Sequence, residues 1–275
     1  MIHFTLRFQV PISGCGDRAW RLSSALVSLV IWASLGVSPA AAQSREWWVD
    51  YSHERAATST DGIDSVWTTD RFATMWSRAG RGHWLFTVEH QQRSGLSDVA
   101  VQGLGYWRAG DWTFSADGGA TPRADFLYRA KGGGEISRRV AGTLVASGAY
   151  HFLQFPSADI HQFEPALTWY YPRGTIEGRV YVTRNATQAR TSTTTLLRAA
   201  CDVAPRLRLS GGASVGDRTF DVASLPSGSA TARVVFGEAQ VGVTRHDFIT
   251  AAVTGAHENP GFSYAALRLA YRRLF

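Results

Sequence analysis

The chain has 275 residues, of which 45% are hydrophobic and 18% are charged, and its formal net charge is +6. This surplus is too modest to indicate nucleic acid as a partner. Only two cysteines occur, Cys15 and Cys201. Because Cys15 lies in the amino-terminal segment that we expect to be removed, the mature chain keeps one cysteine and cannot form an intrachain disulfide.

The amino-terminal segment predicts a secretory signal peptide. Arg18 and Arg21 precede an apolar run over residues 22–37, and Ala40 and Ala42 form an Ala-x-Ala site before Gln43. A transmembrane anchor is the alternative, but this run is short against the roughly 20 residues of a membrane-spanning helix. We therefore expect a signal peptide over 1–42 and one further domain over 43–275.

The mature chain predicts strands throughout. No segment keeps a helical period of 3.6 residues, whereas a period of two recurs. Over residues 112–117, for example, Trp112, Phe114 and Ala116 share one face and polar side chains share the other. The same alternation runs over residues 84–91, 175–183 and 206–215. Strands with one apolar and one polar face are therefore expected from end to end.

Turn signals divide these strands. Tight turns are predicted at 79–82, 109–110, near 142, and at 172–174, 204–205 and 245–247. Longer polar segments are predicted at 55–64, 93–98, 119–128, 155–159, 185–192, 217–229 and 256–261. These connections predict an antiparallel up-and-down transmembrane β-barrel of 14 strands, or 12 if two short strands are misread, with both termini on the periplasmic side.

Aromatic residues support the barrel. Trp76, Trp84, Trp107 and Trp112 flank the short turns, as an interfacial girdle would. The last strand alternates apolar and polar residues and ends on Phe275. We expect Tyr271 and Phe275 to serve barrel closure, because the last strand must pair with the first and leave no edge in lipid. Arg273 interrupts the apolar face, but near the bilayer edge its guanidinium can reach water.

Several segments resemble a known family. They are the 107–112 hairpin (WRAGDW), Gly133–Ile136, Gly148–His151, 163–170 (FEPALTWY) and the closing strand that ends at Phe275. From Trp47 to Phe275 the chain resembles the YaiO-like outer-membrane β-barrel family. The resemblance implies an integral protein of the Gram-negative outer membrane, surrounded by lipids and lipopolysaccharide and inserted by the barrel assembly machinery. It brings no catalytic residues, and His151 stands where an arginine would be typical.

Charged side chains are expected on the face opposite the lipid. An arginine wall in the lumen is predicted from Arg179, Arg198, Arg208, Arg233, Arg268 and Arg272, with Glu135, Glu164 and Glu177 as acidic partners. Guanidinium groups can hydrogen-bond carboxylate, phosphate or sulfate in pairs, so the wall would attract an anionic solute or an acidic polysaccharide. The alternative is an Arg–Glu lattice that fills a narrow barrel and holds it rigid.

The sequence is compatible with three different functions. The first is a channel or export conduit for small or polymeric anionic solutes, such as saccharides. The second is a lipid-modifying hydrolase with a Ser/His pair on the rim, for which His53, His90, His151 and His161 are candidate bases. The third is a closed structural barrel or assembly partner. No serine lies in a recognisable nucleophile motif, and no histidine pair has metal-ligand spacing, so the sequence predicts no catalytic residue, metal or cofactor.

Overall fold

The computed structural model describes residues 45–78, 82–218, 230–258 and 261–275. All of them belong to one compact unit of the chain, residues 42–275. The signal peptide predicted over 1–42 and most of the loop predicted over 217–229 lie outside the described residues. Within the described ranges, no helix is long and apolar enough to cross a membrane.

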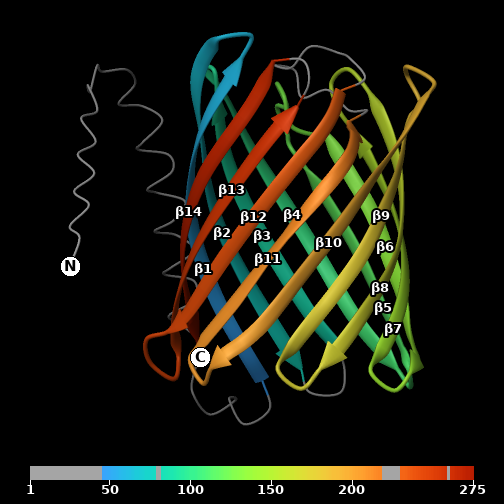
Figure 1. Cartoon of the computed structure of the whole chain (residues 1–275), viewed down its shortest axis with the longest axis vertical. Coiled ribbons are helices and arrows are strands. Elements are labelled where there is room, and N and C mark those ends of the chain that lie inside the picture. Colours follow the sequence, from blue (N-terminus) through green and yellow to red (C-terminus); the bar gives the residue numbers. More distant parts are fainter. Residues whose placement is uncertain (1–44, 79–81, 219–229, 259–260) are drawn as a thin grey trace. The chain divides into compact units, whose positions relative to one another are not determined.

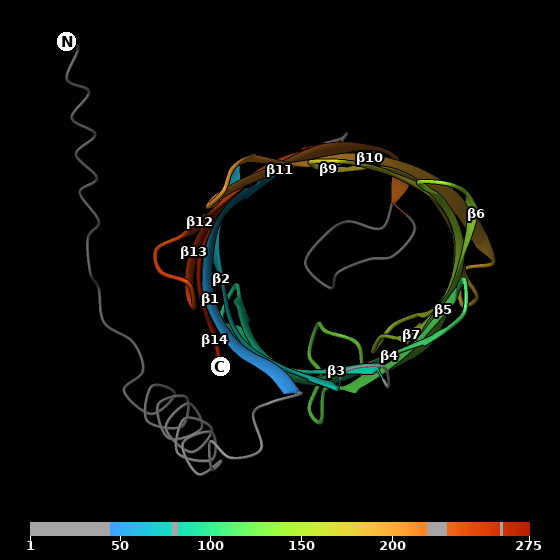
Figure 2. The same ribbon diagram turned by 90° about the horizontal axis from the view of Figure 1, so that it is seen from below.

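The described residues form a closed barrel of 14 antiparallel strands (Figures 1 and 2). The strands are β1 (Arg45–Thr60), β2 (Ile63–Arg78), β3 (Gly82–Arg93), β4 (Leu96–Ala109), β5 (Trp112–Ala120), β6 (Ala130–Ala141), β7 (Leu144–Gln154), β8 (Asp159–Tyr171), β9 (Gly174–Asn185), β10 (Arg190–Ala204), β11 (Leu207–Arg218), β12 (Ala230–Gly242), β13 (Asp247–Glu258) and β14 (Phe262–Leu274). Each pairs with its sequence neighbours, and β14 returns to β1 with Trp48 opposite Leu274. The predicted fold is confirmed, with 14 strands rather than 12.

Side chains alternate between the lumen and the outward face. On β14, Phe262 and Ala266 are buried on the lumen side, while Leu267 and Leu269 are 51% and 54% exposed on the outward side. Leu197 and Val235 are likewise 60% and 61% exposed. An apolar surface of this extent is costly in water, at about 25 cal/mol per Å². Lipid removes that cost, so the outward face has the character of a membrane-facing surface.

Tryptophans collect at the end of the barrel that holds the short turns and both described chain ends. Trp76, Trp84, Trp107 and Trp112 are each between 37% and 43% exposed on the outward face. The rings of Trp84 and Trp107 pack edge to face with centroids 5.4 Å apart. This is the aromatic rim that the sequence predicted, at the height where amphipathic rings meet the membrane interface.

At the opposite end of the barrel, here called the loop end, two of the connections between strands are shorter than predicted. Residues 55–60 belong to β1, so Asp61 and Gly62 alone connect it to β2; likewise Ser94 and Gly95 alone connect β3 to β4. All four residues have positive φ, between 48° and 86°. Asp-Gly and Ser-Gly pairs suit such turns because glycine adopts this conformation without strain. The prediction of long loops over 55–64 and 93–98 was therefore wrong.

Another connection at the loop end, residues 121–129 between β5 and β6, folds onto the lumen wall. Phe126, Leu127 and Tyr128 are buried and pack with Ala100 of β4, against Leu153 and Phe155. The Asp98 side chain is 1% exposed and accepts backbone hydrogen bonds from three consecutive residues, Asp125, Phe126 and Leu127, at 2.7–3.2 Å. We call residues 121–129 the inward loop; Figure 2 shows a green loop inside the ring beside β3 and β4.

Closure of the barrel gives the first testable prediction. The Phe275 backbone N–H donates to the Trp47 carbonyl at 2.9 Å, and the two rings stack with centroids 4.1 Å apart. The Tyr271 hydroxyl donates to Asp247 at 2.6 Å. Deletion of Phe275 removes both contacts of the last residue, so we expect less folded protein in the outer membrane, measured as the heat-modifiable band on gels. Normal assembly of the truncated chain would contradict a role for Phe275 in closure.

Candidate functional site in the lumen

Arg179 of β9 is the centre of an ion network in the lumen. Its guanidinium contacts Glu135 of β6 at 3.0 Å, Glu164 of β8 at 2.7 Å and Glu177 of β9 at 3.1 Å. The side chain of Arg179 is 14% exposed, and those of Glu164 and Glu177 are 9% and 8% exposed. Three carboxylates thus surround one guanidinium, which the planar fork of arginine suits.

His151 of β7 extends this network toward β5. Its Nδ1 lies 3.0 Å from Glu164, and its Nε2 lies 3.0 Å from Asp117. Both ring nitrogens therefore face carboxylate oxygens, which the doubly protonated imidazolium satisfies as a donor on both sides. Lys131 of β6 lies 3.9 Å from Asp117 and donates to Gln102 at 2.7 Å. With Arg198 of β10, which contacts Glu177 at 2.8 Å, the ion network crosses six adjacent strands, from β5 to β10.

The other predicted lumen arginines also have acidic partners. Arg198 contacts Glu177 at 2.8 Å, Arg208 contacts Asp202 at 2.8 Å, and Arg272 contacts Asp50 at 3.1 Å. Arg268 contacts Glu238. The described residues therefore contain the ion pairs that the lattice alternative requires. The side chains of Arg198 and Arg208 are nevertheless 55% and 41% exposed, so part of each guanidinium surface stays open to the lumen.

Arg233 is the exception among the predicted lumen arginines. Its neighbour Val234 lines the lumen, and alternation along β12 turns Arg233 outward, on the side of the 61% exposed Val235. It pairs in register with Val215 and His257, near the loop end. The predicted lumen position of Arg233 was wrong because Val234 and Val235 are both apolar, which leaves the inward face of this segment ambiguous in the sequence.

A chamber of about 400 Å³ opens on the other side of the lumen, along the wall that β12–β14 and β1–β3 form together. Its lining combines charged side chains (Glu54, Arg71, Glu89, Arg93 and Arg268) with aromatic ones (Trp67, Phe262 and Tyr264). Trp67 Nε1 and Arg71 Nε are buried there without a hydrogen-bond partner among the described residues. Buried N–H groups are nearly always paired, so these two donors are suited to donate a hydrogen bond to water or to a solute.

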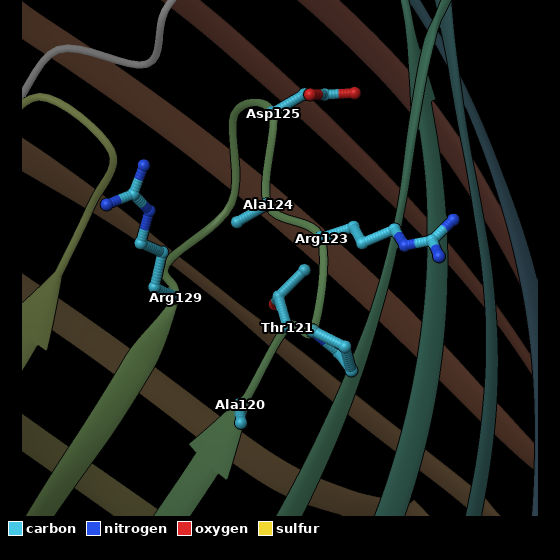
Figure 3. Close-up of a pocket in the computed structure, with 7 residues that line it drawn as sticks. Ala120, Thr121, Arg123, Ala124, Asp125 and Arg129 are labelled. Carbon is cyan, nitrogen blue, oxygen red and sulfur yellow. The ribbon is translucent and has the colours of Figure 1, made fainter.

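The inward loop adds a second polar recess of about 420 Å³, lined by residues 120–125 and Arg129. Arg123 and Arg129 are exposed and project to opposite sides of the loop (Figure 3). Burial, and next the charge of Glu89, raises the pKa of the Tyr128 phenol in this loop to about 12. Tyr128 therefore stays neutral at physiological pH and adds no negative charge to the loop.

The four candidate histidines divide between the two faces. His151 lies in the lumen network, whereas His161 lies outward and bonds the Tyr150 hydroxyl at 2.7 Å. His53 and His90 also lie outward, beside Asp70, and His90 Nε2 lies 2.9 Å from the Ser97 hydroxyl. Asp70 and Ser97 were absent from the sequence prediction. Among the described residues, no group of three His, Cys, Asp or Glu side chains could hold a metal ion.

Comparison with solved structures gives outer membrane barrels at low identity. CymD, a monoaromatic hydrocarbon channel, matches with a TM-score of 0.56 and 7% identity over 84% of this chain and 88% of its own. Omp33 of Acinetobacter baumannii matches with a TM-score of 0.51 and 14% identity over 83% of this chain and 98% of its own. OmpT of Vibrio cholerae, with loop L8 deleted, matches with a TM-score of 0.50 and 8% identity over 85% of this chain and 100% of its own. These identities show a common fold alone. No curated protein matches the chain.

The closed barrel, its apolar outward face, its aromatic rim and its charged lumen define an outer membrane β-barrel protein. The family follows from the sequence comparison. The YaiO membrane beta barrel domain matches residues 58–207, more than half of the chain, from the end of β1 to the start of β11. The chain belongs to this family, and the resemblance noted from its motifs is confirmed.

Proposed function

We propose that the barrel is a channel for small anionic solutes of the saccharide type, which bind on passage in the chamber between β1–β3 and β12–β14. The observation that carries this proposal is that two buried donors in the wall of that chamber, Trp67 Nε1 and Arg71 Nε, have no hydrogen-bond partner in the part of the chain that the structure describes. A donor pair attracts an acceptor-rich group, such as a carboxylate, a sulfate or a sugar hydroxyl.

The rest of the lining supports a sugar. Trp67 and Tyr264, which are partly exposed, offer apolar ring surfaces, while Glu54 and Glu89 offer acceptors for hydroxyl protons. Sites for small molecules combine an apolar lining with a few placed polar groups in this way. Arg198 and Arg208, each paired with one carboxylate, keep part of their guanidinium surface open on the opposite wall, where an anion can contact them.

The proposed orientation places both termini and the aromatic rim on the periplasmic side and the loop end outside the cell. The nine-residue inward loop at the loop end supports it, since outer membrane barrels keep short turns in the periplasm and longer loops outside the cell. The partners in this proposal are outer membrane lipids and lipopolysaccharide around the barrel, the assembly machinery that inserts it, and an anionic solute or polysaccharide in its lumen.

Planar-bilayer recordings with the purified, folded protein test the channel. We expect a reversal potential that favours anions, and a concentration-dependent block of the current by a uronic acid. The Arg71→Gln and Trp67→Phe variants should weaken the block, because each alters the chamber wall. The Arg198→Gln/Arg208→Gln double variant should instead reduce the anion preference and keep the block.

The control is Arg55→Gln, because Arg55 is exposed on the outward face of β1 and alternates with the chamber residues Glu54 and Ala56. This variant should keep both the anion preference and the block by the uronic acid at their wild-type values. Electrical silence of the folded barrel would end the channel proposal. Conduction with a preference for cations would leave a channel but refute the anionic solute.

A further inference from the structure

We propose that the outward face carries a lipid esterase site, with Ser97 as nucleophile, His90 as general base and Asp70 as the residue that positions His90. His90 Nε2 lies 2.9 Å from Ser97 Oγ, and its Nδ1 lies 3.9 Å from Asp70 Oδ2. A nucleophile bonded to a base that a carboxylate orients is the arrangement of serine hydrolases, which is recognised by geometry rather than by sequence order.

The three side chains come from adjacent strands. Asp70 of β2 stands opposite His90 of β3 in register, and Ser97 of β4 stands opposite Gln92, diagonal to His90. Diagonal neighbours on one face of a sheet lie within reach of long side chains. The two-residue turn at Ser94 and Gly95 fixes this register. The site is therefore built from strand positions that the hairpin holds in place.

Asp70 is held on its other side by two further donors. The Tyr51 hydroxyl donates to Asp70 Oδ1 at 2.8 Å, and His53 Nδ1 lies 2.9 Å from the same oxygen. His53, Asp70 and His90 form one lateral row across β1, β2 and β3. The distance from Asp70 to His90 is longer than a hydrogen bond, as is common in unliganded sites that tighten around substrate.

The site faces outward, away from the lumen. Val99 and Val101 share the face of Ser97 and are 40% and 45% exposed, and Phe86 shares the face of His90 and is 59% exposed. Ser97 itself is exposed, whereas the adjacent Asp98 is buried under the inward loop. The hydroxyl therefore meets whatever surrounds the barrel, and the apolar neighbours suit an acyl chain.

The height of the site matches the membrane interface. Ser97 lies ten residues along β4 from Trp107, which belongs to the aromatic rim. Ten residues span about 33 Å along a strand. With a tilt of about 35–45°, they rise about 25 Å, the height of the apolar band of such barrels. Ser97 thus lies near the edge of that band opposite the rim, where the ester bonds of lipids meet water.

The reaction that follows is hydrolysis of an acyl ester. Ser97 Oγ attacks the ester carbonyl carbon while His90 Nε2 takes the hydroxyl proton, and the carbon–oxygen bond to the alcohol breaks as His90 returns that proton to the leaving oxygen. Water then attacks the acyl-Ser97 ester in the same way, which releases a fatty acid and restores Ser97. Gln92 is the side chain placed to donate to the oxyanion, because it stands directly opposite Ser97 and its amide oxygen already accepts from Thr68 at 3.5 Å.

The first experiment is covalent labelling of the purified, folded protein by a fluorophosphonate with an alkyl chain. We expect the wild type to be labelled and Ser97→Ala to stay unlabelled. His90→Gln should slow labelling about 10²- to 10⁴-fold, the usual contribution of a general base. Asp70→Asn should slow it as well, with partial recovery in Asp70→Glu, which a purely structural role of Asp70 would not give. Ser263→Ala is the matched control, because Ser263 is exposed on the outward face of β14 at the loop end.

Mass spectrometry of released fatty acid then identifies the ester. One arm uses diacyl phospholipid in mixed micelles, and the other uses lipopolysaccharide; release in either arm that is lost in Ser97→Ala supports the site. Heat-modifiable migration confirms that each variant is folded, and the bilayer current of Ser97→Ala should equal that of the wild type. Equal labelling of Ser97→Ala and wild type, or no labelling and no release by the folded wild type, would overturn the proposal.

Discussion

Replacement of Arg179 by methionine is expected to destabilise the barrel more than any other single change in the lumen. The guanidinium contacts Glu135, Glu164 and Glu177, and the last two side chains are less than 10% exposed. Its removal leaves three carboxylates close together without their shared partner. Loss of one member of a buried ion pair costs about 3–5 kcal/mol. The midpoint of urea unfolding in lipid vesicles, followed by the gel shift, measures this loss.

Arg198→Gln is the matched comparison for Arg179→Met. Arg198 contacts one of the same carboxylates, Glu177, but its side chain is 55% exposed. Exposed ion pairs contribute about 0–1 kcal/mol, so the midpoint should move little. A second change, Glu164→Gln, should return part of the stability lost in Arg179→Met, since it removes one of the three negative charges that Arg179 neutralises. Equal midpoints for Arg179→Met and Arg198→Gln would refute the central role of Arg179.

Replacement of Asp98 by alanine is expected to release the inward loop. Its carboxylate accepts hydrogen bonds from three consecutive backbone N–H groups, at Asp125, Phe126 and Leu127. A hydrogen bond to a charged group contributes about 1.5–3 kcal/mol, and a buried donor left without a partner costs about as much again. Trypsin should then cleave the folded protein after Arg123 or Arg129, where the wild type resists, and peptide mass spectrometry identifies the cuts.

Asp125→Ala controls for the loss of one carboxylate from the same region. The Asp125 side chain is exposed at the loop (Figure 3), while the contact to Asp98 comes from its backbone N–H. We expect this variant to resist trypsin like the wild type. If Asp98→Ala also resists, the apolar packing of Phe126, Leu127 and Tyr128 alone holds the loop, and the carboxylate anchor is unnecessary.

The fold was largely readable from the sequence because a strand that separates lipid from water must alternate. Leu267, Leu269 and Tyr271 were assigned to the lipid side by this period, and their exposed fractions of 44–54% agree. Prediction failed where alternation weakens. Residues 55–60 read as a loop because His53, Glu54 and Arg55 are polar on both faces, although β1 continues to Thr60. Arg233 was misplaced beside two consecutive valines for the same physical reason.

The candidate sites needed register, which periodicity alone does not give. Arg179 was predicted in the lumen, but its three partners come from β6, β8 and β9, whose relative heights are set by every turn between them. The Ser97–His90 pair had a local signal that was missed. A two-residue Ser94-Gly95 hairpin brings positions 90 and 97 to the same face as diagonal neighbours. Recognition of that turn would have selected His90 from the four candidate histidines.

The lumen has two unlike walls. The ion network covers β5 to β10, whereas the chamber with Trp67, Phe262 and Tyr264 opens between β1–β3 and β12–β14. In the proposed channel, a solute meets ion pairs on one side and a mixture of aromatic rings and charged side chains on the other, with the inward loop as a third point of contact. Three different contacts around one molecule distinguish it from its mirror image. Such a pore would discriminate between the D and L forms of a sugar acid, which have the same size and the same charge.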